Sequence, residues 1–495
     1  MAKAKAEQGQ EAQVEEQDDF ASLLNKEFRP KSDEVKNNVE AAVATLAQQA
    51  LVDSAIVSDD AVESINAIIA EIDKKLTTQI NEIMHHSEFT KLEGAWRGLH
   101  YLVNNSETDE TLKIRVMNVT KQELGKTLKK AKGVGWDQSP LFKKIYGAEY
   151  DVLGGEPYGC LVGDYHFDHS PPDVDLLAGM SKISAAAHAP FITGAAPSVA
   201  QFDTWNELSN PRDLTKIFST PEYAGWNALR DSDDARYLGL AMPRFLGRLP
   251  YGAKTNPVDG FDFEEETDGG NSNNYVWANA AYAMAMNINR SFKEYGWCSR
   301  IRGVESGGTV EDLPVHTFPS ADGGVDMKCP TEVSIGDRRE AELAKNGFMP
   351  LLHRKNTNVA TFIGAQSLQR PAEYDDADAT ANANLAARLP YLFATCRFAH
   401  YLKCMVRDKV GSFKERDDMQ KYLQQWITQY VDGDPANSGE RTKAEKPLAA
   451  AEVVVEEVED NPGYYSSQFF LRPHYQLEGL SVSLRLVSKL PSAKG

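Results

Sequence analysis

The sequence has few cysteines, no long apolar run and no signal peptide, and each absence narrows what the chain can be. Five cysteines occur among 495 residues, and no two of them form a CxxC pair. Because their number is odd and no pairing motif is present, we expect no disulfide framework and a reducing, cytoplasmic location. No run of about 18 apolar residues exists, so we expect no membrane insertion. The N-terminus, MAKAKAEQGQEAQVEEQDD, lacks the apolar core of a signal peptide.

Basic residues are scarce relative to acidic ones. The 53 Lys and Arg residues against 72 Asp and Glu residues give a net charge of −19. Nucleic acid requires a basic face, so we expect no nucleic-acid partner. Anionic membrane surfaces are disfavoured for the same reason. The length suggests two to four domains at about 150 residues each.

The signatures of common catalytic and nucleotide-binding sites are also missing. Gly154 and Gly159 have the spacing of a phosphate loop. Cys160 and Leu161 stand where that motif needs a lysine and a hydroxyl group, so a turn that leads into a strand is the preferred interpretation. Neither a nucleophile elbow nor an HExxH pair occurs. We therefore expect no catalytic residues and no cofactor.

The densest group of possible metal ligands is Asp164, His166 and Asp168. These residues share one face if CLVGDYHF is a strand. At the strand rise the two aspartates lie roughly 13 Å apart, too far for one ion with bonds near 2 Å. Polar residues at a sheet edge are therefore the preferred interpretation. A metal-dependent hydrolase that uses these three side chains remains the alternative.

Cys396, His400 and Cys404 resemble a metal-binding helix face, because they recur every four residues. The two cysteines lie about 12 Å apart along a helix axis, so they cannot share one zinc ion. We expect them to pack in a core or an interface.

The chain begins with a polar segment, residues 1–19, for which we expect disorder. An apolar face follows on a short helix that the Arg29-Pro30 pair ends. So short a helix is marginal alone, and it resembles a peptide that folds against something, either a partner or its own protein. The residues on this face are Phe20, Leu23, Leu24 and Phe28.

Further along, the patterns indicate helices, then a mixed region, then helices and strands. Residues 58–83 carry a long helical stripe, and LKIRVMNV (112–119) alternates as a strand. Between about 150 and 380 short apolar runs alternate with helical windows, which indicates an α+β or α/β region. The last strand pattern has Val482, Leu484 and Leu486 on one face.

Several long blocks occur in a fixed order, among them GGEPYGCLVGDYHFDHSPPDVDLL, LRDSDDARYLGLAMPRFLGRLPYG, PTEVSIGDRREAELAKNGF and FLRPHYQLEGLSVSLRLVSKLP. Together they resemble the large sheath subunit of the bacterial type VI secretion system. The resemblance extends from about Phe20 to Pro491 and rests on many blocks rather than one short motif.

The resemblance implies an α+β fold like that of contractile phage-tail sheath proteins, with N-terminal helices, a mixed α/β core and C-terminal strands shared with neighbouring protomers. It implies a structural protein of the bacterial cytoplasm, without catalysis. Such a subunit pairs with a small sheath subunit and polymerises on a baseplate around an inner tube of hexamers. Contraction drives the tube and its spike out of the cell, and an AAA+ unfoldase then disassembles the sheath.

The resemblance also implies a division of labour along the chain. Residues 1–57 are the flexible tail and helices with the unfoldase handle, and residues 58–150 are a helical region that packs with the small subunit. Residues 151–375 are the mixed core, and residues 376–495 are helices and strands of the inter-subunit sheet. The implied handle consists of Phe20, Leu23, Leu24 and Phe28, and the implied inter-protomer strand carries Val482, Leu484 and Leu486.

Overall fold

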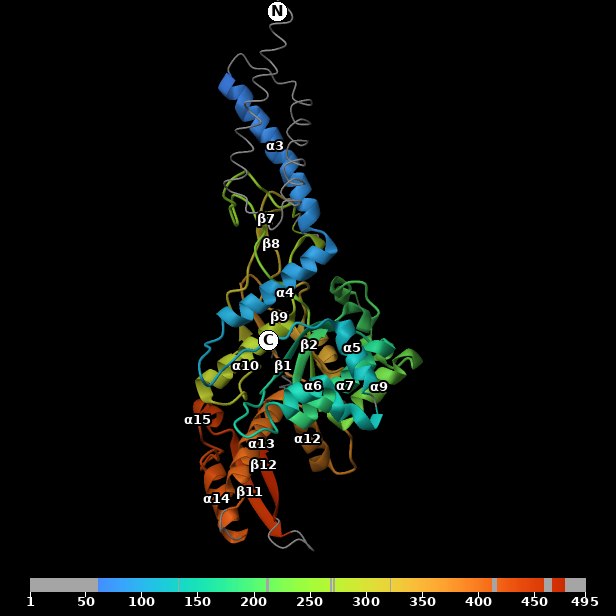
Figure 1. Ribbon diagram of the computed structural model, residues 1–495. Helices are drawn as coiled ribbons and strands as arrows, with labels where there is room; N and C mark the ends of the chain where they lie inside the picture. The colour runs from blue at the N-terminus through green and yellow to red at the C-terminus, as the bar shows by residue number, and fades with distance from the viewer. Residues whose placement is uncertain are drawn as a thin grey trace, which may run out of the picture. The chain divides into compact units, whose positions relative to one another are not determined.

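The computed structural model (Figure 1) describes residues 61–476, except residues 132, 211–212, 268, 270–271, 321, 412–415 and 458–464. The described chain divides into two compact units. Residues 61–90 and 249–275 belong to the first unit, and the other described residues belong to the second. Among the described residues, no helix is both long and apolar enough to cross a membrane.

The first unit combines α3 (Ala61–Met84) and the first turn of α4 (Ser87–Asn104) with the acidic loop 249–275. Asn81 joins the helix to the loop and is only 3% exposed. Its Nδ2 donates to the backbone oxygen of Glu264 at 3.0 Å, and its Oδ1 accepts from the backbone nitrogen of Glu266 at 2.9 Å. This buried amide therefore helps to fix the loop to α3, together with the Thr77 hydroxyl, which donates to the backbone oxygen of Asp262 at 3.3 Å.

A six-stranded sheet forms the centre of the second unit, in the order β1-β2-β3-β9-β10-β6. The first four strands run parallel, and β10 and β6 run antiparallel to their neighbours. All residues of β2 and β3 are buried, as in strands covered on both faces. The strands are β1 (Leu161–Phe167), β2 (Phe191–Ala195), β3 (Leu238–Met242), β9 (Phe348–His353), β10 (Ala360–Phe362) and β6 (Thr309–Val310).

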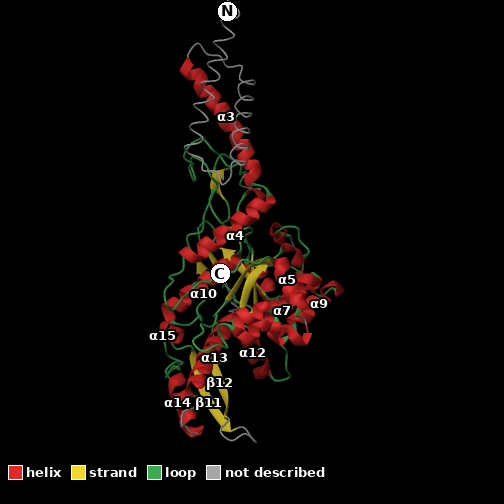
Figure 2. Cartoon of the chain, viewed as in Figure 1, coloured by secondary structure: helices red, strands yellow, loops and turns green. Residues whose placement is uncertain are grey.

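Helices cover both faces of this sheet, so successive strand residues enter two different cores. Phe191 and Phe348 enter the first core, whereas their neighbours Ile192 and Met349 enter the second. Figure 2 shows α5, α7 and α9 to one side of the strands and α10 to the other. The mixed α and β fold expected from the sequence is confirmed. The covering helices are α5 (Lys121–Lys130), α7 (Pro171–Ala187) and α9 (Ala224–Arg230) on the first core, and α10 (Ala280–Tyr295) and α13 (Leu389–Lys409) on the second.

A third core lies under the C-terminal hairpin of β11 (Leu448–Glu457) and β12 (Tyr465–Pro473). The helix α14 (Arg416–Thr428) packs on β11, as Figure 1 shows. Trp297 stacks on Phe398 of α13 with ring centroids 4.2 Å apart, which joins this core to the end of α10. The hairpin therefore shares a hydrophobic core with the rest of the second unit.

Shorter elements complete the second unit. The helices among them are α6 (Pro140–Phe142), α8 (Leu214–Phe218), α11 (Asp337–Lys345), α12 (Ala377–Ala386) and α15 (Glu440–Glu445). Two small antiparallel pairs join β4 (Phe245–Leu246) to β5 (Trp277–Ala278) and β7 (Thr317–Pro319) to β8 (Val325–Met327).

The main part of α4 lies very close to the segment from β5 to α10. A Cβ atom on Gly94 would lie 2.4 Å from the backbone oxygen of Trp277, and one on Gly98 would lie 2.4 Å from the ring of Tyr282. The absence of a Cβ atom at these two positions therefore lets α4 contact the backbone of Trp277 and the ring of Tyr282. The opposite face of α4 consequently points away from the second core.

Candidate functional site

The three possible metal ligands on β1 have separate environments. Asp164 hydrogen-bonds with the side chains of Asn279 and Tyr282, and burial raises the pKa of its carboxyl group. Burial, helped by nearby cations, lowers the pKa of His166 to about 3, so its imidazole is neutral. Among the described residues, no three His, Cys, Asp or Glu side chains are placed to hold a metal ion. The alternative of a metal-dependent hydrolase therefore has no support.

The remaining charged groups of this cluster connect three elements. Lys121, at the start of α5, donates to Asp173 Oδ2 at 2.7 Å and to the backbone oxygen of His166 at 2.6 Å. Asp173, in the first turn of α7, also accepts from the backbone nitrogen of Asp168 at 2.9 Å. The Asp168 carboxylate accepts from the backbone nitrogen of Ser170. The preferred interpretation is confirmed, because β1 is an edge strand and these polar groups fasten its end.

The Cys396, His400 and Cys404 face of α13 is also structural. His400 is 2% exposed, and its Nε2 lies 2.8 Å from the backbone oxygen of Ala187 at the end of α7. Burial lowers the pKa of His400 to about 4. Because Cys396 is buried in the second core and His400 is also buried, the prediction of packing is confirmed for these two residues, whereas Cys404 is only partly buried.

The prediction of a strand at 112–119 is wrong for the part of the chain that the structure describes, because residues 113–120 there pair with no strand. Ile114 packs on the second core and Val119 on the first. Between them, the side chains of Val116 and Met117 are 67% and 51% exposed. The two ends of this segment therefore pack against cores of the second unit, whereas its middle is exposed to solvent.

This open segment lies beside the edge of the central sheet. The Tyr165 hydroxyl of β1 donates to the backbone oxygen of Val119 at 2.7 Å. At the other end Arg115 forms ion pairs with Glu149 and Glu156. Within the described residues β1 pairs only with β2, so its second edge has no strand partner. An unpaired edge of this kind is a template for a strand from another chain.

The outward face of α4 carries a second uncovered feature. Leu92, Trp96 and Val103 are 57%, 65% and 42% exposed, and their spacing places them along one side of the helix. The buried glycines Gly94 and Gly98 lie on the side that touches the core. Clustered exposed apolar side chains commonly mark a protein interface.

One edge of the C-terminal hairpin is closed by side chains. Gln424 Oε1 of α14 accepts from the backbone nitrogen of Val453 at 2.9 Å, and Gln420 Oε1 accepts from that of Val455 at 3.4 Å. Gln424 also donates to the backbone oxygen of Ala451 at 3.2 Å. The two glutamines therefore occupy the groups that an added strand would need on β11.

The other edge of the hairpin, along β12, has no strand partner among the described residues. Val453 lies opposite Phe469 and Val455 lies opposite Ser467. In an antiparallel pair, opposed residues direct their N–H groups the same way relative to the ladder, both inward or both outward. Since those of Val453 and Val455 point outward, so do those of Phe469 and Ser467. The hairpin is thus ready to accept a strand on its β12 side.

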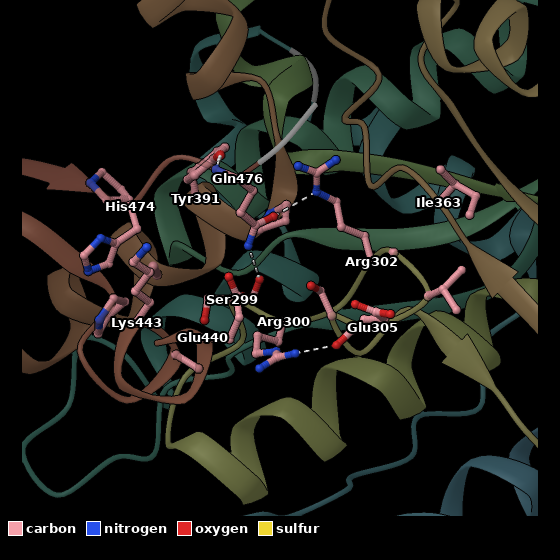
Figure 3. Close-up of a pocket in the computed structure, with 18 residues that line it drawn as sticks. Ser299, Arg300, Arg302, Glu305, Ile363, Tyr391, Glu440, Lys443, His474 and Gln476 are labelled. Atoms are coloured by element: carbon pink, nitrogen blue, oxygen red, sulfur yellow. Dashed lines mark hydrogen bonds between the residues drawn. The ribbon is translucent and has the colours of Figure 1, made fainter. Parts of the chain in front are cut away.

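A cavity of about 520 Å³ lies where the described chain ends (Figure 3). Gln476 reaches into it and holds three partners. Its backbone nitrogen donates to the Tyr391 hydroxyl at 2.9 Å, its Nε2 donates to the backbone oxygen of Ser299 at 2.8 Å, and its Oε1 accepts from Arg302 Nε at 2.9 Å. Three hydrogen bonds therefore anchor Gln476, the last residue that the structure describes, in this cavity.

Both sets of functional residues named from the sequence lie outside the described residues. This applies to the predicted unfoldase helix with Phe20, Leu23, Leu24 and Phe28, and to the predicted inter-protomer strand with Val482, Leu484 and Leu486.

Comparisons with known proteins agree along most of the chain. Residues 66–369 match the family described as EvpB/VC_A0108, tail sheath N-terminal domain, and residues 378–490 match its tail sheath gpW/gp25-like domain. The type VI secretion system sheath protein TssC1 of Pseudomonas aeruginosa is 73% identical over 481 residues, which cover 97% of each chain.

Similarity to solved structures is weaker. The cryo-EM structure of the anti-feeding prophage baseplate matches with a TM-score of 0.36 and 11% identity, over 64% of this chain and 67% of that one. The contracted helical sheath of the same particle matches with a TM-score of 0.27 and 12% identity, over 63% and 66%.

Proposed function

This chain belongs to the EvpB/VC_A0108 family of tail sheath proteins, and from that membership we propose that it is the large subunit of a type VI secretion sheath in the bacterial cytoplasm. It has a structural task rather than a catalytic one. It pairs with a small sheath subunit, and the pairs polymerise on a baseplate around an inner tube of hexamers. The observation that carries the proposal is the 73% identity to a named sheath protein over nearly the whole chain.

The small subunit, in this proposal, covers the open edge of β1 with the neighbouring segment 113–120, and the outward face of α4. The edge offers unpaired backbone groups, which a partner strand satisfies by β-augmentation. Leu99 of α4 and Ile114 pack against the same second core. The outward face of α4 and the segment 113–120 are therefore both anchored on that core. Trp96, the most exposed apolar side chain of α4 in the second unit, is the expected anchor of this contact.

The pairing is tested by co-purification of the two subunits. The Trp96→Asp variant is expected to bind the small subunit at least about 30-fold more weakly, because a central aromatic anchor commonly contributes 2 kcal/mol or more. The matched control is Tyr374→Asp, which alters a tyrosine that is 57% exposed in the segment before α12. If Trp96→Asp retained the small subunit as well as this control, the proposed contact would be wrong.

Neighbouring large subunits are joined, in this proposal, by the open edge of β12. The donated strand carries Val482, Leu484 and Leu486 of another protomer. Gln476 supports this arrangement because three hydrogen bonds hold it in place six residues before the predicted strand begins. Backbone hydrogen bonds between protomers can persist while the folded units rotate, so these strands keep the lattice connected during contraction.

The stroke itself is proposed to come from a bistable change of interfaces. Many identical contacts each differ slightly in free energy between the extended and the contracted packing, and their sum drives the tube outward. The contracted sheath is then disassembled by an AAA+ unfoldase, whose handle is the predicted helix with Phe20, Leu23, Leu24 and Phe28. A short amphipathic helix beside a polar segment suits capture in a groove.

The handle is tested with the Leu24→Asp variant. We expect normal tubules, because the change lies outside the proposed assembly surfaces, and at least about tenfold weaker unfoldase binding, because a charge enters the apolar face. Binding is measured by fluorescence anisotropy of labelled peptides that span residues 15–32. The control peptide carries Asn25→Asp, which adds the same charge off that face. Equal affinities for all three peptides would refute the assignment.

A further inference from the structure

The long helix α3 carries an apolar stripe that belongs to no hydrophobic core of the described chain. Ile69 and Ile83 on this stripe are 50% and 53% exposed, and the apolar side chains between them are only partly buried. Among the described residues, no side chain of α3 is part of any of the three cores. The apolar stripe of a surface helix normally packs against a core, so we expect another segment to cover this one. The described members of the stripe are Ile69, Ile72, Leu76, Ile80 and Ile83.

A different face of α3 attaches the helix to its own unit. Thr77 and Asn81 form hydrogen bonds with the acidic loop 249–275. At about 100° per residue, these two side chains leave the helix about 120° away from the centre of the apolar stripe. The contacts with the loop therefore do not use the stripe.

A hollow of about 320 Å³ lies at the C-terminal end of the stripe. Ile83 belongs to both, and Phe89 at the start of α4, which is 41% exposed, adds a second apolar wall. The stripe and the hollow thus adjoin and present apolar side chains from Ile69 to Phe89. An elongated apolar surface of this kind suits an amphipathic helix. The residues that line the hollow are Gln79, Glu82, Ile83, His86 and Phe89.

A segment that precedes α3 in the sequence matches this surface in length. Residues 35–46 predict an amphipathic helix, because their apolar side chains recur every three or four positions. The apolar face of this helix spans about 17 Å, compared with about 21 Å from Ile69 to Ile83. The predicted helix from Phe20 to Phe28 has an apolar face of only about 12 Å, which would cover little more than half of the stripe. The apolar residues of segment 35–46 are Val35, Val39, Val43 and Leu46.

We propose that residues 35–46 form a helix that docks antiparallel on the apolar stripe of α3 in the same chain. Residues 47–60 then span about 17 Å from Leu46, beside Ile72, to the start of α3. A parallel helix would stretch this connection over about 33 Å, at a greater cost in chain entropy. The antiparallel arrangement places Val35 beside the hollow.

The docked helix limits where the proposed unfoldase handle can lie. With Val35 beside the hollow, residues 29–34 join the docked helix to Phe28, and a chain of this length reaches about 25 Å when it is extended. The handle therefore stays close to the C-terminal end of α3. This consequence rests on the proposed function, whereas the docking itself does not.

Amide hydrogen exchange of the full-length protein, co-purified with its sheath partner, tests the docking. We expect the amides of residues 36–46 to exchange at least about tenfold more slowly than those of the polar segment 1–19. Ile69→Asp and Val43→Asp each place a charge in the contact, one from either side, and are expected to abolish this protection. The matched controls Thr78→Asp and Gln48→Asp place the same charge on the other faces of the two helices, and we expect them to keep it.

Two results of the exchange measurement would overturn the proposal. One is exchange of residues 36–46 as fast as that of residues 1–19. The other is protection that survives Ile69→Asp, because a different surface would then cover the segment. Val43→Asp leaves α3 itself unchanged, so its result does not depend on the folding of an altered α3.

Cross-linking identifies the copy that supplies the helix. Light and isotopically heavy protein are mixed in equal amounts before assembly and treated with an amine cross-linker. We expect peptides that join Lys36 to Lys74 or Lys75 to be light–light or heavy–heavy. Mixed pairs in about half of these peptides would show that a second copy supplies the helix, and they would overturn the assignment to the same chain.

Discussion

A chain that ends at Gly479 is expected to fold, to bind the small subunit and to form no tubules. The deletion removes the predicted strand with Val482, Leu484 and Leu486, while it leaves Gln476 and the whole hairpin of β11 and β12 in place. Each of the three apolar side chains would contribute about 1.5–3 kcal/mol if it is buried against a neighbour. Because every protomer lacks the donated strand, the proposed contact between neighbouring large subunits is lost at every position of the lattice.

The expectation follows from the asymmetry of the hairpin. Gln420 and Gln424 already satisfy outward backbone groups of β11, so a donated strand finds its partners on β12. There the N–H groups of Ser467 and Phe469 point outward, and the ring of Phe470 is 56% exposed. A hairpin with one closed and one open edge accepts one strand and then stops, which suits a connection between two protomers.

A matched truncation separates the loss of the strand from the loss of a few terminal residues. The control chain ends at Pro491, which removes four residues and keeps the predicted strand. Negative-stain electron microscopy of co-expressed subunits should show tubules for this control and for the full chain. Normal tubules from the chain that ends at Gly479 would contradict the role assigned to the C-terminal strand.

The alternating apolar pattern of residues 112–119 predicted a strand, but it did not identify a segment with which that strand pairs. The alternation of LKIRVMNV holds only in part, because Ile114 packs on one core whereas Val116, two residues later on the same face, is 67% exposed, and Val119 on the opposite face packs on the other core. Alternation records burial on one face of an extended chain. It contains no information on the hydrogen-bonding partner, which in this account belongs to a different protein.

The Asp/His cluster shows where simple geometry was enough. A strand that carries Asp164 and Asp168 cannot bring both carboxylates to one ion, and this argument required only the strand rise. The ties from Lys121 to Asp173 and to the His166 backbone were not predictable, because they join positions 45 and 52 residues apart in the sequence. Such contacts depend on how β1, α5 and α7 are packed.

The glutamines are the functional residues that sequence reasoning missed. Gln420 and Gln424 are four residues apart on one face of α14, a spacing that is ordinary on a solvated helix. Gln476 stands in an unremarkable polar stretch next to the C-terminal strands. No charge, cofactor motif or periodicity distinguishes them, because their role arises only from the backbone groups of β11 and of the cavity wall that they meet.

The central claim is that strand edges left open in this chain are closed by other chains in the sheath. Peptides that cover residues 113–120 and 465–473 report on it, because segment 113–120 and the outer edge of β12 have no strand partner within the described chain. Because the inward amides of β12 already pair with β11 and the Thr120 amide donates to Glu123, only protection that these peptides gain when free subunits assemble into tubules reports on another chain. Peptides from β2, which is paired on both sides, and from the exposed loop 354–358 serve as the protected and unprotected references.

Amide hydrogen exchange of assembled tubules, read by mass spectrometry, is the most direct measurement. We expect amides in 113–119 and the outward amides of β12, such as those of Ser467 and Phe469, to exchange at least about 100-fold more slowly in tubules than in free subunits, because strands of the partner subunit and of a neighbour then accept their hydrogen bonds. If these amides exchanged in tubules as fast as those of the 354–358 loop, the edges would be open in the sheath and the central claim would be contradicted.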